Sequence, residues 1–557
     1  MKNNLRSINF NTKYQAMLIM IVIIILAAVL RLIVLDKYPA GLNADEAAIG
    51  YNAYSLLQTG KDEYGTPFPL SFKSFGDYKP GLYFYFVMPF VAILGLNEWA
   101  VRIPSALFGI GTVILIYFLA KEIFKNRWVG IFSSLLLAIS PWHIHFSRGG
   151  WETNAATFFM ALGIFLFTKS LESFKLIWWS LLAFLMSMYI YQSPRLIIPV
   201  LLLALVFIYR ERINSMIRII ETREAIASII ILIFLTIPLI MQFTSGGASE
   251  RFQGLSFLAD SGPSSRVNEL RGEHTNPGSL AVLFLHNKLT SYVPEFLGNY
   301  LDHFKGNFLF INGDPLIRNK IPDVGQFYLI EALFLFAGLF ILVKQKNPHT
   351  KLLASWIMIA PLASSMTYQT PHALRALNMV VPLSLVMGYG LWNIGNWLKR
   401  FVNITFIIII TTITVILSFE FIHYLESYYI HYPKRYPLAW EYGFSEMVTK
   451  LNKYESAYEN VVITDRYDQP YILVLFYKKY DPEKYQPQAV LSPRDKFNFG
   501  TVRGFDKYKF HSINEEELKN AKDTLFIGAE QEIPETSKII DKIFFPDGKI
   551  AFVFAET

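Results

Sequence analysis

The chain has 557 residues, of which 53% are hydrophobic and 17% are charged, and a formal net charge of +7. The charged fraction is well below the roughly 25% of soluble domains, and several apolar runs reach the about 18 residues that cross a bilayer. Cysteine is absent, which excludes disulfides, thiolate nucleophiles and zinc–thiolate sites. The basic residues lie mainly in short loops between apolar runs, so the charge indicates a polytopic membrane protein rather than nucleic-acid binding.

The apolar runs predict eleven membrane spans. We expect them near residues 15–35, 102–120, 128–142, 154–170, 175–191, 195–209, 225–243, 326–343, 352–368, 374–397 and 401–420. The first run is too long for the core of a signal peptide and has no evident cleavage site, which predicts an uncleaved span. The run 80–96 contains Gly81, Pro89 and Gly95 and is expected to dip into the membrane or lie at its surface.

The charges of the loops give these spans a direction. With the N-terminus in the cytoplasm, every cytoplasmic loop is basic, as the positive-inside rule requires. These loops carry Lys121, Lys125, Arg127, Lys169, Lys175, Arg210, Arg212, Arg218, Arg223, Lys344, Lys346, Lys351, Lys399 and Arg400. The odd number of spans then leaves the C-terminus outside. A full crossing by 80–96 would invert every later loop, which argues against counting it as a span.

Two domains are predicted. Residues 1–429 form the membrane domain, with long outside loops at 36–101 and 244–325; the second is rich in Gly, Ser, Asn and Pro and is expected to be mobile or to act as a lid. Residues 430–557 form a soluble α/β domain outside the membrane. Its predicted elements are strands at Val461–Thr464, Leu525–Ile527 and Ile550–Phe554, a helix at Gln469–Lys479, a capping box from Asn514 to Glu517 and a hairpin turn at Pro546–Gly548.

Asp45 and Glu46 follow the first span directly and precede an amphipathic stretch, Ala47–Leu57. An acid at the membrane edge can act as general base toward an acceptor hydroxyl, and the pair can bind a divalent metal. The alternative is structural: Asn43 or Asp45 caps the start of a surface helix.

Lys79 lies in the sequence Asp77-Tyr78-Lys79-Pro80-Gly81, immediately before the dipping segment. A lysine at this depth can hold a lipid phosphate as a point charge, with Tyr78 beside it. The alternative is a lysine that extends its ammonium group to the interface, which is common at membrane surfaces.

The outside turn at 143–153 concentrates His143, His145, Arg148 and Glu152 in ten residues. Such density between hydrophobic spans favours polar contacts to a sugar or a phosphate. The two histidines share a face only if the segment is extended, and a metal site would need a third ligand that the turn does not supply. An aromatic and basic interfacial belt is the structural alternative.

Three arginines at outside span ends run against the positive-inside trend: Arg102, Arg195 and Arg375, the last with His372 beside it. A shared anionic ligand would explain them, and salt bridges to Asp45, Glu46 or Glu152 are the structural alternative. The second long loop adds a polar turn, Asn312-Gly-Asp314-Pro with Arg318. This is ordinary turn chemistry, and a direct role in the site is the alternative.

The order of these motifs resembles a known family. An acidic pair after the first span, then Tyr-Lys-Pro, then Asn97-Glu-Trp-Ala-Val-Arg102-Ile-Pro and Ser140-Pro-Trp-His-Ile-His-Phe-Ser-Arg148 are similar to GT-C glycosyltransferases of the protein O-mannosyltransferase and lipid A aminoarabinose transferase type. The resemblance covers about 15–420 and is most specific in the first 155 residues. One departure is Gly81, where the family often has a second proline.

The resemblance implies a membrane enzyme that moves a sugar from a polyprenyl-phosphate carrier to an acceptor outside the cytoplasmic membrane, usually with inversion. In that family Asp45 matches the catalytic acid and Lys79 matches the lysine that contacts the carrier phosphate. No cofactor is required, and a divalent metal on Asp45 and Glu46 stays an open alternative. The partners implied are the lipid-linked donor, an acceptor lipid, glycan or protein, and membrane lipids.

Two other function classes explain the sequence less well. A transporter or flippase of a polyprenyl-linked lipid would favour polar residues at the bilayer midplane, whereas here the polar residues gather outside. A non-enzymatic envelope scaffold leaves the outside arginines and Lys79 without a role. No nucleotide-binding or GxSxG motif is present, so nothing in the sequence supports nucleotide-driven chemistry on the inner face.

Overall fold

The structure is a computed structural model that describes residues 4–217, 222–244, 262–345, 347–401, 403–493 and 500–556. Its contacts divide the chain into two compact units, which are described separately. The first unit contains Met1–Ala27, Gly111–His143 and Ala156–Phe421. The second contains Ala28–Ile110, Ile144–Ala155 and Ile422–Thr557. It therefore joins the whole predicted first outside loop to the C-terminal region and cuts across the predicted boundary at 429/430.

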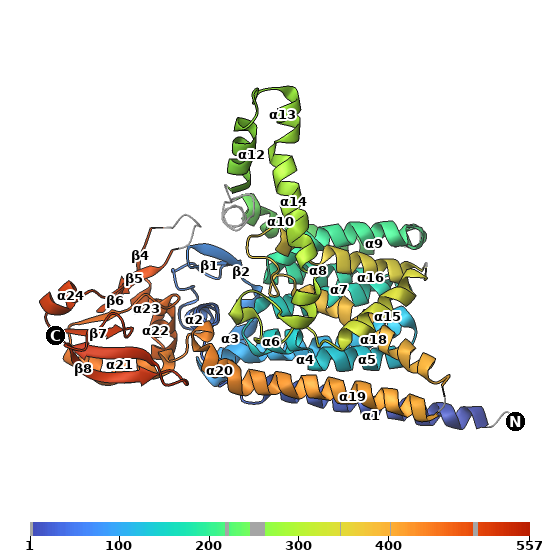
Figure 1. The fold of residues 1–557 in the computed structure, drawn as a ribbon, viewed down its shortest axis with the longest axis horizontal. Coiled ribbons are helices and arrows are strands. Elements are labelled where there is room, and N and C mark those ends of the chain that lie inside the picture. Colours follow the sequence, from blue (N-terminus) through green and yellow to red (C-terminus); the bar gives the residue numbers. More distant parts are fainter. Residues whose placement is uncertain are drawn as a thin grey trace. The chain divides into compact units, whose positions relative to one another are not determined.

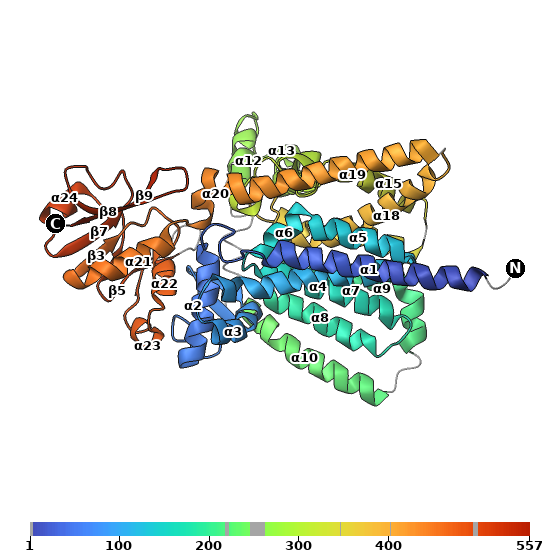
Figure 2. The same ribbon diagram turned by 90° about the horizontal axis from the view of Figure 1, so that it is seen from below.

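The first unit is a bundle of apolar helices whose axes are roughly parallel to one another (Figure 2). It takes most or all of each of the following helices: α1 (Asn4–Leu32), α4 (Glu98–Phe124), α5 (Arg127–Ile139), α7 (Glu152–Ser170), α8 (Leu176–Ile190), α9 (Ser193–Ile217), α10 (Thr222–Thr244), α15 (Glu331–Val343), α16 (Pro348–Ile359), α17 (Leu362–Ser365), α18 (Val380–Leu398) and α19 (Asn403–Glu426).

Small residues allow the central helices of this bundle to approach closely. A Cβ atom built on Gly390 of α18 would lie 1.9 Å from the carbonyl oxygen of Phe334 on α15, and one on Gly338 would lie 2.2 Å from that of Val386. Neither position can hold a larger residue without separating the helices, as is typical of helix packing in membranes.

Four helical stretches among the described residues are long and apolar enough to cross a membrane by length and composition: Tyr14–Leu32, Glu98–Phe124, Leu377–Leu398 and Asn403–Arg435. The bent pair α5 and α6 (Pro141–Arg148), with an angle of 58°, makes a fifth if it counts as one span. Shorter apolar helices occur at Leu82–Leu94, Leu176–Ile190, Ser228–Gln242 and Glu331–Val343. The chain is therefore a helical membrane protein, and the number of eleven spans stays a prediction.

The second long loop, which is expected to be mobile or to act as a lid, contains helices in the part that the structure describes. Residues 262–302 form helices α12 (Gly262–Gly272), α13 (Leu280–Leu285) and α14 (Lys288–Asp302), followed by a π-helix at Asn307–Ile311 and a 3₁₀ turn at Ile317–Asn319. Asn287 caps α14 with its side chain, a local signal that composition alone conceals. Residues 245–261 of the predicted loop lie outside the described residues.

The second unit begins with the helix α2 (Ala44–Thr59), a hairpin of β1 (Ser71–Ser74) and β2 (Asp77–Pro80), and the helix α3 (Leu82–Leu94). At about 1.5 Å per residue, the 13 residues of α3 extend roughly 20 Å, short of the about 30 Å hydrocarbon core. This length agrees with the predicted dipping segment.

The C-terminal region folds into a seven-stranded sheet of order β4-β5-β6-β3-β7-β9-β8, confirming the predicted α/β domain (Figure 1). The strands are β3 (Asn460–Ile463), β4 (Val490–Leu491), β5 (Val502–Phe505), β6 (Tyr508–Phe510), β7 (Thr524–Gly528), β8 (Lys538–Phe544) and β9 (Ile550–Glu556). Strand β3 pairs in parallel with β6 and β7, and the other pairings among the described strands of this sheet are antiparallel. Helices α21 (Phe444–Tyr454), α22 (Pro470–Lys478) and α24 (Glu515–Asn520) accompany the sheet. The Asn514 side chain caps α24 by accepting from the Glu517 amide, which is one of the two bonds of the predicted capping box.

Candidate active site

Asp45 and Lys79 form an ion pair in the second unit. Asp45 is the second residue of α2, where the N-terminal end of the helix favours a carboxylate. Lys79 comes from β2, and its Nζ atom lies 5.1 Å from the centre of the Phe75 ring. The side chain of Asp45 is 28% exposed and that of Lys79 is 10% exposed. The two side chains are therefore in direct contact, with Lys79 buried and Asp45 partly exposed.

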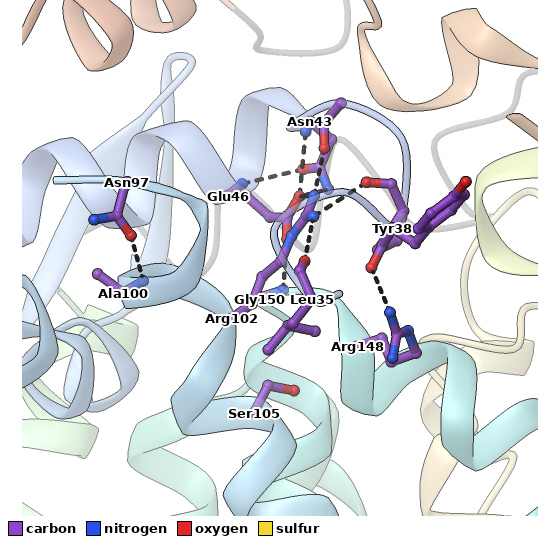
Figure 3. A network of polar contacts seen from close by, with 12 residues as sticks. Leu35, Tyr38, Asn43, Glu46, Asn97, Ala100, Arg102, Ser105, Arg148 and Gly150 are labelled. Atoms are coloured by element: carbon purple, nitrogen blue, oxygen red, sulfur yellow. Dashed lines mark hydrogen bonds and ion pairs between the residues drawn. The ribbon is translucent and has the colours of Figure 1, made fainter. Parts of the chain in front are cut away.

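Glu46, the neighbour of Asp45, is fully buried and held on every side (Figure 3). Arg102 of α4 donates from Nε to Oε1 at 2.9 Å and from Nη2 to Oε2 at 3.1 Å. The Gly150 amide donates to Oε1 at 2.7 Å, and Asn43 donates to Oε2 from its side chain at 3.1 Å. Asn43 in turn accepts from the Glu46 amide and caps α2. The cap was the structural alternative for this acidic pair, but α2 is mostly buried instead of lying on the surface.

Arg102 has no donor left for a ligand. Besides its bonds to Glu46, it donates from Nη1 to the carbonyls of Leu35 and Pro39 at 3.0 and 3.1 Å, and from Nη2 to that of Gly41. These contacts use all five N–H donors of the guanidinium group. The proposed phosphate role of Arg102 is therefore not supported, and the salt-bridge alternative describes it.

Arg148 is engaged in the same way and is fully buried. It donates to the Tyr428 hydroxyl at 3.1 Å and to the carbonyls of Leu30, Ile33 and Tyr38 at 2.9, 2.9 and 3.0 Å. It thereby ties the end of α1 to the segment that follows α19. An anionic ligand would have to displace several of these bonds, so Arg148 is a structural anchor in this arrangement.

The segment around Arg148 is not the predicted turn. Residues 141–148 form the helix α6, in which His143 and His145 project about 200° apart. His145 is buried in the second unit against Tyr428, Tyr432 and Trp440. His143 belongs to the first unit and is also buried. Glu152, mostly buried, is the first residue of α7. The helix explains why the two histidines do not form a common face.

Tyr78 precedes Lys79 in β2, so its side chain projects to the opposite face of the strand. It is half-buried, and its amide donates to the Asp77 carboxylate at 2.6 Å. The structure therefore places Tyr78 beside the ion pair in sequence but on the other side of the hairpin.

In the first unit, His372 and the turn at Asn312–Pro315 come together although they lie far apart in sequence. Asp314 is buried and accepts from the amides of Leu316 and Ala373 at 2.7 and 2.5 Å and from the Asn319 side chain at 3.1 Å. His372 Nδ1 lies 3.7 Å from its carboxylate. Burial raises the pKa of Asp314 to about 6. Burial, with Arg375 nearby, lowers the pKa of His372 well below its usual value.

Arg375 and Arg195 also lie in the first unit. Arg375 donates to the Thr367 hydroxyl at 2.7 Å and to the Tyr368 carbonyl at 3.2 Å. Arg195 is mostly buried and donates to the Met188 carbonyl at 3.0 Å and to Gln242 Oε1 at 2.8 Å. The roles of both arginines toward an anion stay predictions.

Glu63 is a buried acid that the sequence pattern does not single out. It is fully buried, exchanges two hydrogen bonds with Asn52 at 2.9 and 3.1 Å, and accepts from the Tyr471 hydroxyl at 3.5 Å. Burial raises its pKa to about 8, and Lys79 acts in the opposite direction. A lone glutamate in a polar loop carries no sequence signal for this burial, because Tyr471 comes from a distant part of the chain.

The structure gives no support to a metal on Asp45 and Glu46. Both oxygens of Glu46 accept from protein donors, and Asp45 pairs with Lys79. Among the residues that the structure describes, no group of three or more His, Asp or Glu residues is arranged to hold an ion. A divalent metal needs more ligands than this pair offers.

Comparison with known proteins supports the resemblance seen in the sequence. Residues 78–241, which include Lys79, match the family described as dolichyl-phosphate-mannose-protein mannosyltransferase. Two putative mannosyltransferases of Bacillus subtilis (strain 168) are similar over short stretches: YkcB is 34% identical over 86 residues and YycA is 30% identical over 100 residues. These stretches cover 15% and 18% of the chain and only 12% and 14% of the two relatives.

Solved structures show the fold over nearly the whole chain. ArnT from Cupriavidus metallidurans, solved with undecaprenyl phosphate, aligns with a TM-score of 0.51 and 10% identity over 98% of both chains. The archaeal oligosaccharyltransferase AglB from Archaeoglobus fulgidus, solved with an inhibitory peptide and a dolichol-phosphate, aligns with a TM-score of 0.52 and 11% identity over 84% of this chain and 64% of its own. The chain therefore has the GT-C fold of membrane glycosyltransferases, as the sequence resemblance predicts.

Proposed function

We propose that this protein is a membrane glycosyltransferase that moves a sugar from a polyprenyl-phosphate carrier to an acceptor hydroxyl outside the cytoplasmic membrane. The observation that carries the proposal is the Asp45–Lys79 ion pair, which joins a partly exposed base to a cation. The GT-C fold and the match of residues 78–241 to a mannosyltransferase family support it.

The pair supplies two of the groups that the transfer needs. The phosphate of the carrier carries negative charge and competes with Asp45 for the ammonium group of Lys79. When Lys79 moves to the phosphate, the Asp45 carboxylate loses this neighbouring positive charge, which raises its affinity for a proton. Binding of the donor thus prepares the base, because the same lysine cannot neutralise both anions fully.

The transfer step follows from these roles. The acceptor oxygen attacks the anomeric carbon of the sugar on the face opposite the phosphate, which inverts that carbon. The bond between the anomeric carbon and the phosphate oxygen breaks, and its electron pair stays on the phosphate, next to Lys79. The proton of the acceptor hydroxyl passes to Asp45. The carrier phosphate leaves as the product, so the step needs no nucleotide.

Glu46 and Arg102 act as positioning residues in this proposal. The buried pair fixes the first turn of α2 against α4, and this turn carries Asp45. The charge that would stabilise the phosphate beyond Lys79 does not come from Arg102 or Arg148, whose donors are taken by the protein itself. Arg195 and Arg375 stay candidates for this role.

The test uses purified protein, a radiolabelled polyprenyl-phosphate sugar and a panel of lipid, glycan and protein acceptors. We expect Asp45→Asn to retain binding of undecaprenyl phosphate but to lose transfer by a factor of roughly 10²–10⁴, the usual contribution of a general base. Lys79→Met should weaken binding of undecaprenyl phosphate, whereas Lys79→Arg should keep most of it.

Two results would contradict the proposal. Transfer by Asp45→Asn at the parent rate would show that Asp45 is not the general base. Movement of the intact labelled lipid across vesicles without transfer to any acceptor would instead indicate a transporter or flippase.

A further inference from the structure

The helices α12, α13 and α14 form an arm that projects from the first unit. We name residues Gly262–Asp302 the helical arm. Figure 1 shows α14 and α12 running across the direction of α9, α15 and α16. The base of the arm is attached to the bundle, because the Tyr300 hydroxyl donates to the Met358 carbonyl at 2.7 Å and His303 Nε2 lies 2.7 Å from the Ser364 hydroxyl.

The arm has an inner face that its own helices bury. Val267 of α12, Val282 of α13 and Tyr292 of α14 are all less than 10% exposed. The Tyr292 hydroxyl lies 3.1 Å from that of Ser264, and the Ser291 hydroxyl donates to the Pro263 carbonyl at 3.1 Å. These contacts fix which side of α14 faces α12, and therefore which side faces away.

The outward side of α14 is an apolar stripe. Its residues recur every four positions, the spacing that places side chains on one face of a helix. The stripe continues onto α13, and its members are between 42% and 86% exposed: Leu280, Phe284, Leu289, Val293, Leu297 and Leu301. No described residue of the protein covers this stripe. Burying so many exposed leucines in an apolar phase is strongly favourable, which indicates a covering partner.

We propose that the helical arm lies along the membrane surface with this stripe in the boundary between headgroups and acyl chains. Three observations favour lipid over a protein partner. The arm runs across the membrane-spanning helices, which is the direction of the bilayer plane. The stripe is a single narrow line along one helix, as in helices that lie in an interface. The end of the arm nearest the bundle meets another exposed apolar residue, Met358, whose carbonyl accepts from the Tyr300 hydroxyl.

The absence of cysteine makes a direct test available. Single cysteines at Leu289 and Leu297 place a polarity-sensitive fluorophore on the stripe of the full-length protein. Glu269→Cys, at an exposed polar position of α12, is the matched control within the same arm. Phe336→Cys, at an exposed position of the apolar helix α15, reports contact with lipid. Each variant is reconstituted into phosphatidylethanolamine and phosphatidylglycerol vesicles, with and without lipids that carry a nitroxide near the top of the acyl chain.

Probes at Leu289 and Leu297 should emit at shorter wavelength than the probe at Glu269 and should be quenched by the nitroxide lipids, as at Phe336. Emission and quenching equal to those at Glu269 would show that the stripe is in water and would overturn the proposal. Emission at shorter wavelength without quenching would also overturn it, because a protein surface, such as a second copy, would then cover the stripe. The test needs no substrate, so its result is independent of the proposed transferase activity.

Discussion

Glu46 and Arg102 meet through two parallel hydrogen bonds at 2.9 and 3.1 Å, with neither side chain exposed to solvent. The pair lies next to Asp45 in sequence and joins α2 to α4. Of the two neighbouring acids, Glu46 therefore has a structural role, whereas Asp45 stays partly exposed. Removing one partner of a buried ion pair leaves an uncompensated charge.

We therefore expect Arg102→Met to lower the free energy of unfolding by about 3–5 kcal/mol. The measurement is thermal unfolding of the purified protein in detergent. The double variant Glu46→Gln with Arg102→Met should recover part of the loss, because the isolated carboxylate is gone. Equal stability of the single and double variants would show that the two charges are not coupled.

Arg148 should behave as an anchor and not as a phosphate ligand. Arg148→Met removes donors from several backbone carbonyls and should cost on the order of 1–3 kcal/mol in thermal unfolding. Binding of undecaprenyl phosphate, measured below the unfolding temperature, should change much less than in Lys79→Met. A loss of binding as large as that of Lys79→Met would show that Arg148 also binds the phosphate.

Glu63 should make the stability of the second unit depend on pH. Its pKa is raised from 4.5 to about 8 in the fold, so the folded state binds a proton that the unfolded chain releases. The stabilisation is complete below pH 4.5 and is lost as the pH rises toward about 8. Glu63→Gln should flatten this part of the profile of unfolding temperature against pH. A slope in Glu63→Gln as steep as in the parent would exclude Glu63 as its source.

The C-terminal domain should contribute to donor binding through Tyr471. Its ring meets that of Phe75 edge-on at 6.2 Å, and Phe75 lies under the ammonium group of Lys79. The Phe75 carbonyl also accepts from the Gly500 amide at 2.9 Å. Tyr471→Leu should raise the KM for the donor several-fold with a smaller change in kcat, whereas Tyr471→Phe keeps the ring and should be milder. An unchanged KM in Tyr471→Leu would show that this contact of the C-terminal domain does not contribute to donor binding.

Asp314 should stabilise the first unit by holding the turn before Ala373. Asp314→Ala leaves the Leu316 and Ala373 amides and the Asn319 side chain without this acceptor. Each buried donor left unsatisfied costs about 1–3 kcal/mol. Thermal unfolding should show a clear loss, and Asp323→Ala, in the same region but exposed, is the control. Similar effects of both substitutions would indicate that the hydrogen bonds to Asp314 contribute little to the free energy of unfolding.

Local signals in the sequence were sufficient for much of the fold. The apolar runs predicted the membrane helices, because their length and composition are independent of distant contacts. The strands at Val461–Thr464, Leu525–Ile527 and Ile550–Phe554 and the helix at Gln469–Lys479 were also recognised from local pattern. The helical arm was missed because composition rich in Gly, Ser and Pro hides caps such as Asn287, which act through one specific hydrogen-bond geometry.

The sequence by itself determined that this is a helical membrane protein with a C-terminal α/β domain, and it singled out Asp45 and Lys79. Only the tertiary structure decided which charged residues are accessible. Arg102, Arg148 and Lys79 are all cations near predicted membrane ends, and their sequence contexts do not separate them. Their difference arises from burial: two arginines are enclosed by backbone carbonyls brought from distant segments, whereas Lys79 meets a partly exposed carboxylate. Such long-range contacts depend on the packing of the whole chain, which no local pattern encodes.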